Sequence, residues 1–152
     1  MNLKNIAILA CLLAAACGDA HDDGPAGMQP TAYAQMNREQ RTAFMSAVVV
    51  PQMTQIFTAF DAKFQNLSCK TCHGNGAADG TFAMPSPQVP ALPASEEAFA
   101  EYVKDPEHAR WSQFMIEQVW PKMADLLQVD KFDPAAHPEG LSCHNCHTLI
   151  GP

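Results

Sequence analysis

The sequence carries the pattern Cys-x-x-Cys-His twice. The two copies comprise Cys69, Cys72 and His73, and then Cys143, Cys146 and His147. Two thiols separated by two residues lie on one side of a single helical turn, and the following His lies beside them. The spacing therefore predicts two local sites, each presenting two sulfurs and one imidazole to a shared ligand.

Cys-x-x-Cys-His is typical of covalent haem attachment. In such sites each thiol forms a thioether with a haem vinyl group, and the His is the proximal iron ligand. The alternatives are one four-Cys zinc site, redox dithiols, or two structural disulfides. Zinc does not require a His after both pairs, and a redox dithiol normally lies at a strand-to-helix turn of an α/β fold. The motifs therefore predict two haem c groups, each with one iron.

Residues 1–17 have the features of an export signal. Lys4 precedes an apolar run over residues 6–16, which is too short to span a membrane as a helix. The small residues before Cys17 resemble the lipobox of bacterial lipoproteins. That resemblance implies a membrane anchor through a lipidated Cys17 on the periplasmic side, and the following Gly18 favours the outer membrane. The alternative is ordinary signal-peptidase cleavage.

The rest of the chain divides into a tether and a folded body. Residues 18–36 are rich in Gly, Pro and Asp and predict a flexible tether, whereas residues 37–152 are long enough for one domain. The formal net charge is −7, from 9 basic and 16 acidic residues. Such a surface argues against nucleic-acid binding and suits a protein partner with a basic face.

The body contains an internal duplication with an offset of seventy positions, giving units over about residues 38–93 and 94–152. Apolar residues with helical spacing precede each motif, and Pro51 and Pro121 lie at matching places within them. Each proline is expected either to kink its helix or to begin a second one. Between the units, residues 83–93 predict an extended Pro-rich loop, and Ser95 predicts an N-cap for a helix through Tyr102. We therefore expect an all-α fold.

The order of helix, turn and Cys-x-x-Cys-His helix resembles the repeat of the cytochrome subunit of photosynthetic reaction centres. The resemblance covers about residues 38–73 and 108–147 and is specific at the two haem motifs. It implies a small helical multihaem cytochrome c, in which a Met of the preceding helix is the sixth iron ligand. Met53 and Met123 have the same place in each unit and are the expected ligands.

Other residues are alternatives for the sixth iron ligand. Met45 and Met115 are the next pair in the same helices, and Met84 follows the first motif in the Pro-rich loop. A Met in an apolar helical stripe is more often part of the core. His108 and His137 could also ligate a haem, which would give it a lower potential. A place at the surface is expected for both, as for the other spare histidines, His21 and His144.

These residues predict an electron carrier rather than an enzyme. An iron closed on both faces exchanges electrons with redox partner proteins and needs no small-molecule substrate. The donor and acceptor are not readable from the sequence, and a fixed place in a larger complex is compatible with the same chemistry. The alternative is a haem enzyme, or a gas- or peroxide-binding protein, with one open iron.

Overall fold

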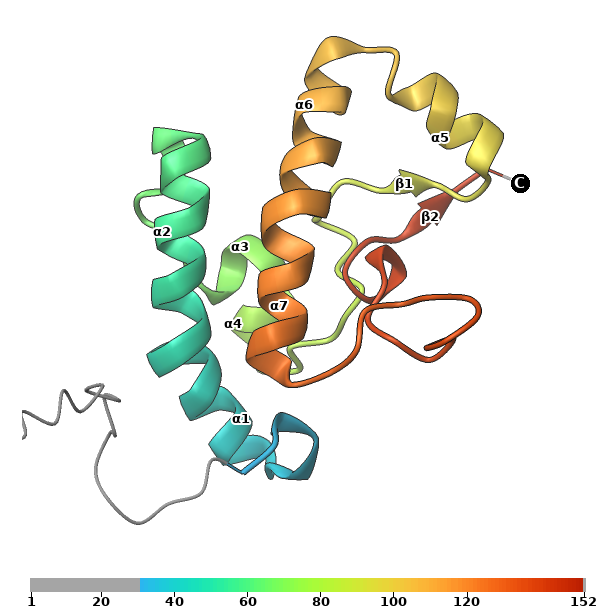
Figure 1. Ribbon diagram of the computed structural model, residues 1–152. Coiled ribbons are helices and arrows are strands. Elements are labelled where there is room, and N and C mark those ends of the chain that lie inside the picture. The colour runs from blue at the N-terminus through green and yellow to red at the C-terminus, as the bar shows by residue number, and fades with distance from the viewer. Residues whose placement is uncertain (1–30, 152) are drawn as a thin grey trace, which may run out of the picture. The chain divides into compact units, whose positions relative to one another are not determined.

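The computed structural model describes residues 31–151 (Figure 1). This part is mostly helical, with two short strands, so the expected all-α class is confirmed at that level. The export signal, Cys17, His21 and tether residues 18–30 lie outside the described residues. The end of the predicted tether forms a 3₁₀ turn, η1 (Tyr33–Gln35), and the Tyr33 ring lies 5.9 Å from the Phe44 ring.

The first long helix runs from Arg38 to Phe60 and has three segments. These are α1 (Arg38–Phe44), the π-helical η2 (Met45–Val49) and α2 (Val50–Phe60). Asn37 caps the start, since its side chain accepts from the Gln40 N–H at 3.0 Å. The 23 residues meet the length and hydropathy of a membrane span, a test that the core helix of a soluble protein also passes.

The second long helix repeats this arrangement seventy positions later. It consists of α6 (Pro106–Phe114), the π-helical η4 (Met115–Val119) and α7 (Trp120–Leu127). Asp105 caps it by accepting from the N–H groups of Glu107 and His108 at 2.8 and 3.0 Å. Figure 1 shows that α6 and α7 run antiparallel to α2.

The two prolines neither break their helices nor begin separate ones. Pro51 follows η2, in which the Val50 N–H donates five residues back to the Met45 carbonyl, and Pro121 follows η4, where Trp120 and Met115 repeat this bond. A proline ring clashes with the carbonyl four residues earlier, and the wider π turn accommodates it. Both units therefore have a π turn at matching positions directly before the proline.

Aromatic side chains join the two helices. Phe60 stacks on Phe114 at 4.0 Å, and Phe57 meets Phe114 edge-on at 5.1 Å. Among the described residues, the buried hydrophobic side chains are few: Val49, Met53, Phe57, Leu67, Phe114 and Ala124. The hydrophobic core that these side chains form is therefore small for a chain of this length.

The remaining elements are short and surround the two motifs. After α2 come η3 (Ala62–Phe64), α3 (Cys69–His73) and α4 (Gly76–Asp79). The strand β1 (Leu92–Pro93) pairs in parallel with β2 (Leu149–Ile150), which follows η5 (Cys143–Asn145). The helix predicted after Ser95 is confirmed as α5 (Glu96–Tyr102), since the Ser95 hydroxyl accepts from the Ala98 N–H at 3.2 Å.

Candidate functional site

The first motif forms the one-turn helix α3. Its start is held because the Ser68 N–H donates to the Thr71 hydroxyl at 3.1 Å. Leu67, just before it, is buried in the core that α2 and α6 share. The motif is thereby attached to the first long helix, and Cys69, Cys72 and His73 are each half-buried.

The Pro-rich segment over residues 83–93, called the linker below, packs on the C-terminal end of α3. The Gln88 side chain accepts from the Asn75 N–H at 3.0 Å, and Ser86 beside it is fully buried. Gly74 has φ +54°, and a Cβ at this position would lie 2.1 Å from Gln88 Oε1. Only glycine fits between the motif and the linker without strain.

Replacing Gly74 with Ala is expected to destabilise the fold by about 1–3 kcal/mol from backbone strain and a further 1–3 kcal/mol from overlap with Gln88. Gly80→Ala is the matched control, because Gly80 also has a positive φ (+75°) but its nearest neighbour is 3.8 Å from a built Cβ. Urea unfolding followed by circular dichroism measures both. Equal destabilisation of the two variants would contradict the packing of the linker on α3.

A cavity of about 430 Å³ lies beside the first motif. It is lined by Cys69 and His73 and by residues of η1, α1, η2 and the α4 loop: Tyr33, Met36, Arg38, Arg41, Thr42, Met45, Thr81 and Phe82. His73 Nδ1 is buried and has no hydrogen-bond partner among the described residues. Burial lowers the pKa of His73, an effect that the Phe82 backbone partly offsets. The first motif thus presents a neutral imidazole beside an apolar and cationic cavity.

The second motif is a 3₁₀ turn rather than an α-helix. The Ser142 N–H donates to Asn145 Oδ1 at 2.7 Å, matching the start of the first motif. Directly after it the chain extends into β2, because the Leu92 N–H donates to the Thr148 carbonyl at 2.9 Å. Trp120 connects this motif to the second long helix, since its indole N–H donates to the Leu141 carbonyl at 2.6 Å.

His147 has a partner that the sequence did not reveal. Its Nδ1 lies 2.7 Å from the Pro90 carbonyl, and a carbonyl can only accept, so Nδ1 carries the proton. In the neutral ring the lone pair is then on Nε2. Histidines that ligate metals characteristically donate their other ring N–H in this way. No pattern in the sequence links Pro90 to a residue 57 positions later.

All four described cysteines are free thiols. Burial, then the neighbouring Cys146 and Cys69, raise the pKa of Cys72 to about 11. Burial also raises the pKa values of Cys143 and Cys146. The same short linker contacts both motifs, through Gln88 at Asn75 and through Pro90 at His147. Within residues 31–151, no three Cys, His, Asp or Glu side chains converge as a metal site would require.

The methionines fall into two environments. Met53 is 3% exposed and belongs to the core, whereas Met45 lines the cavity beside His73. Met115 and Met123 are half-buried and pack against the same core. Met84 precedes Pro85 in the linker and is also half-buried. The expected ligand Met53 therefore lies within the helix pair, and the cavity holds Met45.

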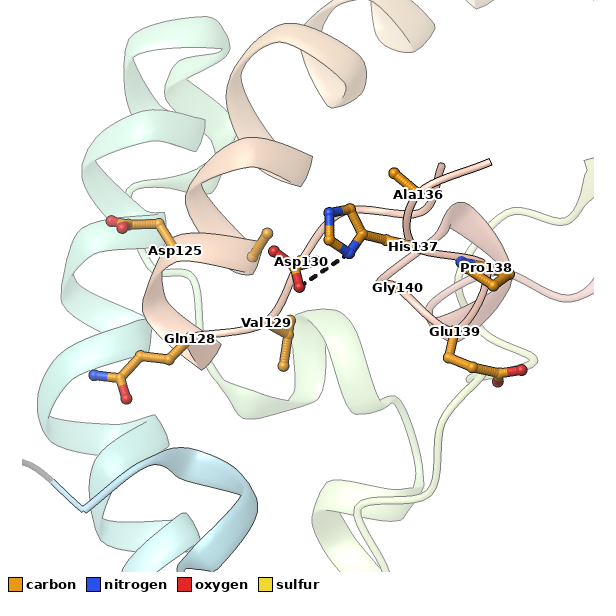
Figure 2. Close-up of a pocket in the computed structure, with 10 residues that line it drawn as sticks. Asp125, Gln128, Val129, Asp130, Ala136, His137, Pro138, Glu139 and Gly140 are labelled. Carbon is orange, nitrogen blue, oxygen red and sulfur yellow. Dashed lines mark ion pairs between the residues drawn. The ribbon is translucent and has the colours of Figure 1, made fainter. Parts of the chain in front are cut away.

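A larger cavity, of about 760 Å³, lies between the end of α7 and the loop that follows it (Figure 2). It contains no motif residue. His137 Nδ1 there pairs with Asp130 at 3.2 Å, and most of the lining residues are exposed. The His108 ring stacks on the Tyr102 ring at 3.8 Å, and His108 Nδ1 is hydrogen-bonded to the Tyr102 carbonyl. His108 is far from both motifs in the sequence.

Comparison with family models, with curated proteins and with solved structures finds no match for this chain. What the described residues define is a helical protein with two adjacent Cys-x-x-Cys-His motifs, each attached to one of two antiparallel helices.

Proposed function

We propose that this chain is an electron carrier with two covalently bound haem c groups, one at each Cys-x-x-Cys-His motif. The observation that carries the proposal is the hydrogen bond from His147 Nδ1 to the Pro90 carbonyl, beside two free thiols. This bond makes Nδ1 the donor, so that Nε2 is the nitrogen that a neutral ring offers to iron. When bound, haem iron supplies a one-electron couple between its ferric and ferrous states.

The residues of each motif have separate tasks. When haem is bound, the two cysteines of each motif would hold the ring through thioethers, whose formation from a thiol S–H and a vinyl group involves no net oxidation. Burial raises the pKa values of Cys72 and Cys146, which keeps these thiols protonated at neutral pH. His73 and His147 would each hold the iron through one ring nitrogen.

The packing of the described residues suits large apolar ligands. The core is thin, and several large hydrophobic side chains are exposed around the second motif, including Phe132 (42%), Leu149 (41%) and Ile150 (58%). An apolar ring over these side chains would remove them from water, which stabilises at about 25 cal/mol per Å².

Met53 and Met123 are the methionines that we propose would bind the two irons, because they occupy matching places two residues after the matching prolines. Met45 is the second candidate at the first haem, favoured by its place in the cavity beside His73. A thioether is a soft ligand that favours ferrous iron. Ligation by Met therefore raises the reduction potential.

The linker contacts both motifs, through Gln88 at Asn75 and through Pro90 at His147, and this shared contact favours electron exchange between the two sites. Donor and acceptor are redox proteins that approach from solvent, and no substrate bond is made or broken. With an anchor at Cys17, the carrier is placed on the periplasmic side of a membrane, in keeping with the sequence before residue 18.

The proposal is tested by expressing the chain with c-type maturation machinery and recording optical spectra of the reduced protein with and without carbon monoxide. Haem bands that carbon monoxide leaves unmoved are the expected result. Absence of covalent haem would overturn the proposal and favour the alternative of one four-Cys zinc site. A carbon monoxide shift in half or all of the haem would instead identify an open iron, and thus a gas- or peroxide-binding protein.

A further inference from the structure

We propose that Arg38 and Arg41 bind the propionate carboxylates of the haem attached at Cys69 and Cys72, and that their charge raises the potential of this haem above that of the other. The inference rests on the proposed function. It concerns the residues that bind the propionate edge of the first haem and thereby make the reduction potentials of the two haems different.

Both guanidinium groups line the cavity that holds Cys69 and His73. No carboxylate lines this cavity, although the chain has 16 acidic residues against 9 basic ones. A haem edge with two carboxylates needs cationic partners if it is not to lie against a repulsive surface. This cavity provides them in an otherwise acidic protein.

The backbone positions both arginines. Arg38 donates to the Gly80 carbonyl, and Arg41 donates to the Ala34 carbonyl at 3.0 Å while lying 5.1 Å above the Tyr33 ring. Neither forms an ion pair with a described carboxylate, whereas Arg110 pairs with Glu107 at 3.3 Å. A guanidinium has five N–H donors, so each retains donors for a carboxylate.

The second unit lacks these charges at the equivalent positions. Seventy residues later stand His108 and Trp111. His108 stacks on Tyr102, and Trp111 donates to Glu107 at 2.8 Å and packs on Phe60. The duplicated helices therefore provide two arginines to the first site and none to the second.

A positive charge near the iron disfavours the ferric state, which carries one more positive charge than the ferrous state. Arg38→Gln/Arg41→Gln is expected to retain two haems and to shift the reduction equilibrium of one haem about tenfold towards the ferric state, which is about 59 mV for a one-electron couple. The other haem should keep its potential. Arg110→Gln is the matched control, because Arg110 lies over Phe60 and outside the cavity.

The measurements are optical redox titration and the number of covalent haems by mass. Two unshifted potentials in the double Gln variant, with both haems present, would overturn the assignment while leaving the proposed function intact. A wild-type protein without haem would instead remove the proposed function itself. If the Gln variant loses one haem, Arg38→Lys/Arg41→Lys should restore it with a potential near the wild-type value. Failure of Lys to restore it would exclude the charge as the cause.

Discussion

Replacing Cys69 and Cys72 together with Ala is expected to lower the covalent haem content from two groups to one. Replacing Cys143 and Cys146 should do the same, and the quadruple variant should retain none. The reason is that each pair supplies both thioether bonds of its own ring, so neither pair substitutes for the other. Mass spectrometry of the denatured protein counts the attached groups directly.

Lys70→Ala is the matched control for this experiment. Lys70 lies between the two cysteines of the first motif, is exposed, and contributes neither sulfur nor imidazole. It should retain two haems and wild-type spectra. Two results would contradict two independent attachment sites. One is the loss of both haems when only one Cys pair is replaced, and the other is a change in bound zinc in place of a change in haem.

Replacing Met53 or Met123 with Leu is expected to open one iron to carbon monoxide and to lower its potential. Axial ligands set haem potentials over about 0.8 V, so loss of a thioether should be worth on the order of 100 mV. Leu is chosen over Ala because Met53 is buried, and Met→Ala in a core costs about 2–5 kcal/mol whereas Met→Leu usually costs under about 1.5 kcal/mol. The readouts are carbon monoxide binding and redox titration.

Met45→Leu and Met115→Leu are the matched controls, because they alter the same helices at equivalent positions eight residues earlier. They should leave both irons closed. If Met45→Leu opens the first haem and Met53→Leu does not, the ligand is the methionine that lines the cavity, and the proposed pair is wrong at that site.

Much of the local structure was predictable from short-range patterns. Helical spacing and the offset of seventy positions located both long helices, and Ser95 located the start of α5 correctly. Helix positions and N-caps depend on residues within one or two turns, so they can be predicted from the local sequence. The prolines were located, but the sequence did not show that a π turn before each one would accommodate its ring within a continuous helix.

The sequence alone supports the inferences of two haem motifs, of His73 and His147 as iron ligands and of an electron carrier. The reason is that the chemistry of Cys-x-x-Cys-His depends on residues at most four positions apart. Only the tertiary structure decided which distant groups meet them. It brought Pro90 to His147, Gln88 to Gly74, and two arginines of α1 to the cavity beside His73. Such contacts join residues that are up to 57 positions apart, and the first two form where the linker packs on both motifs.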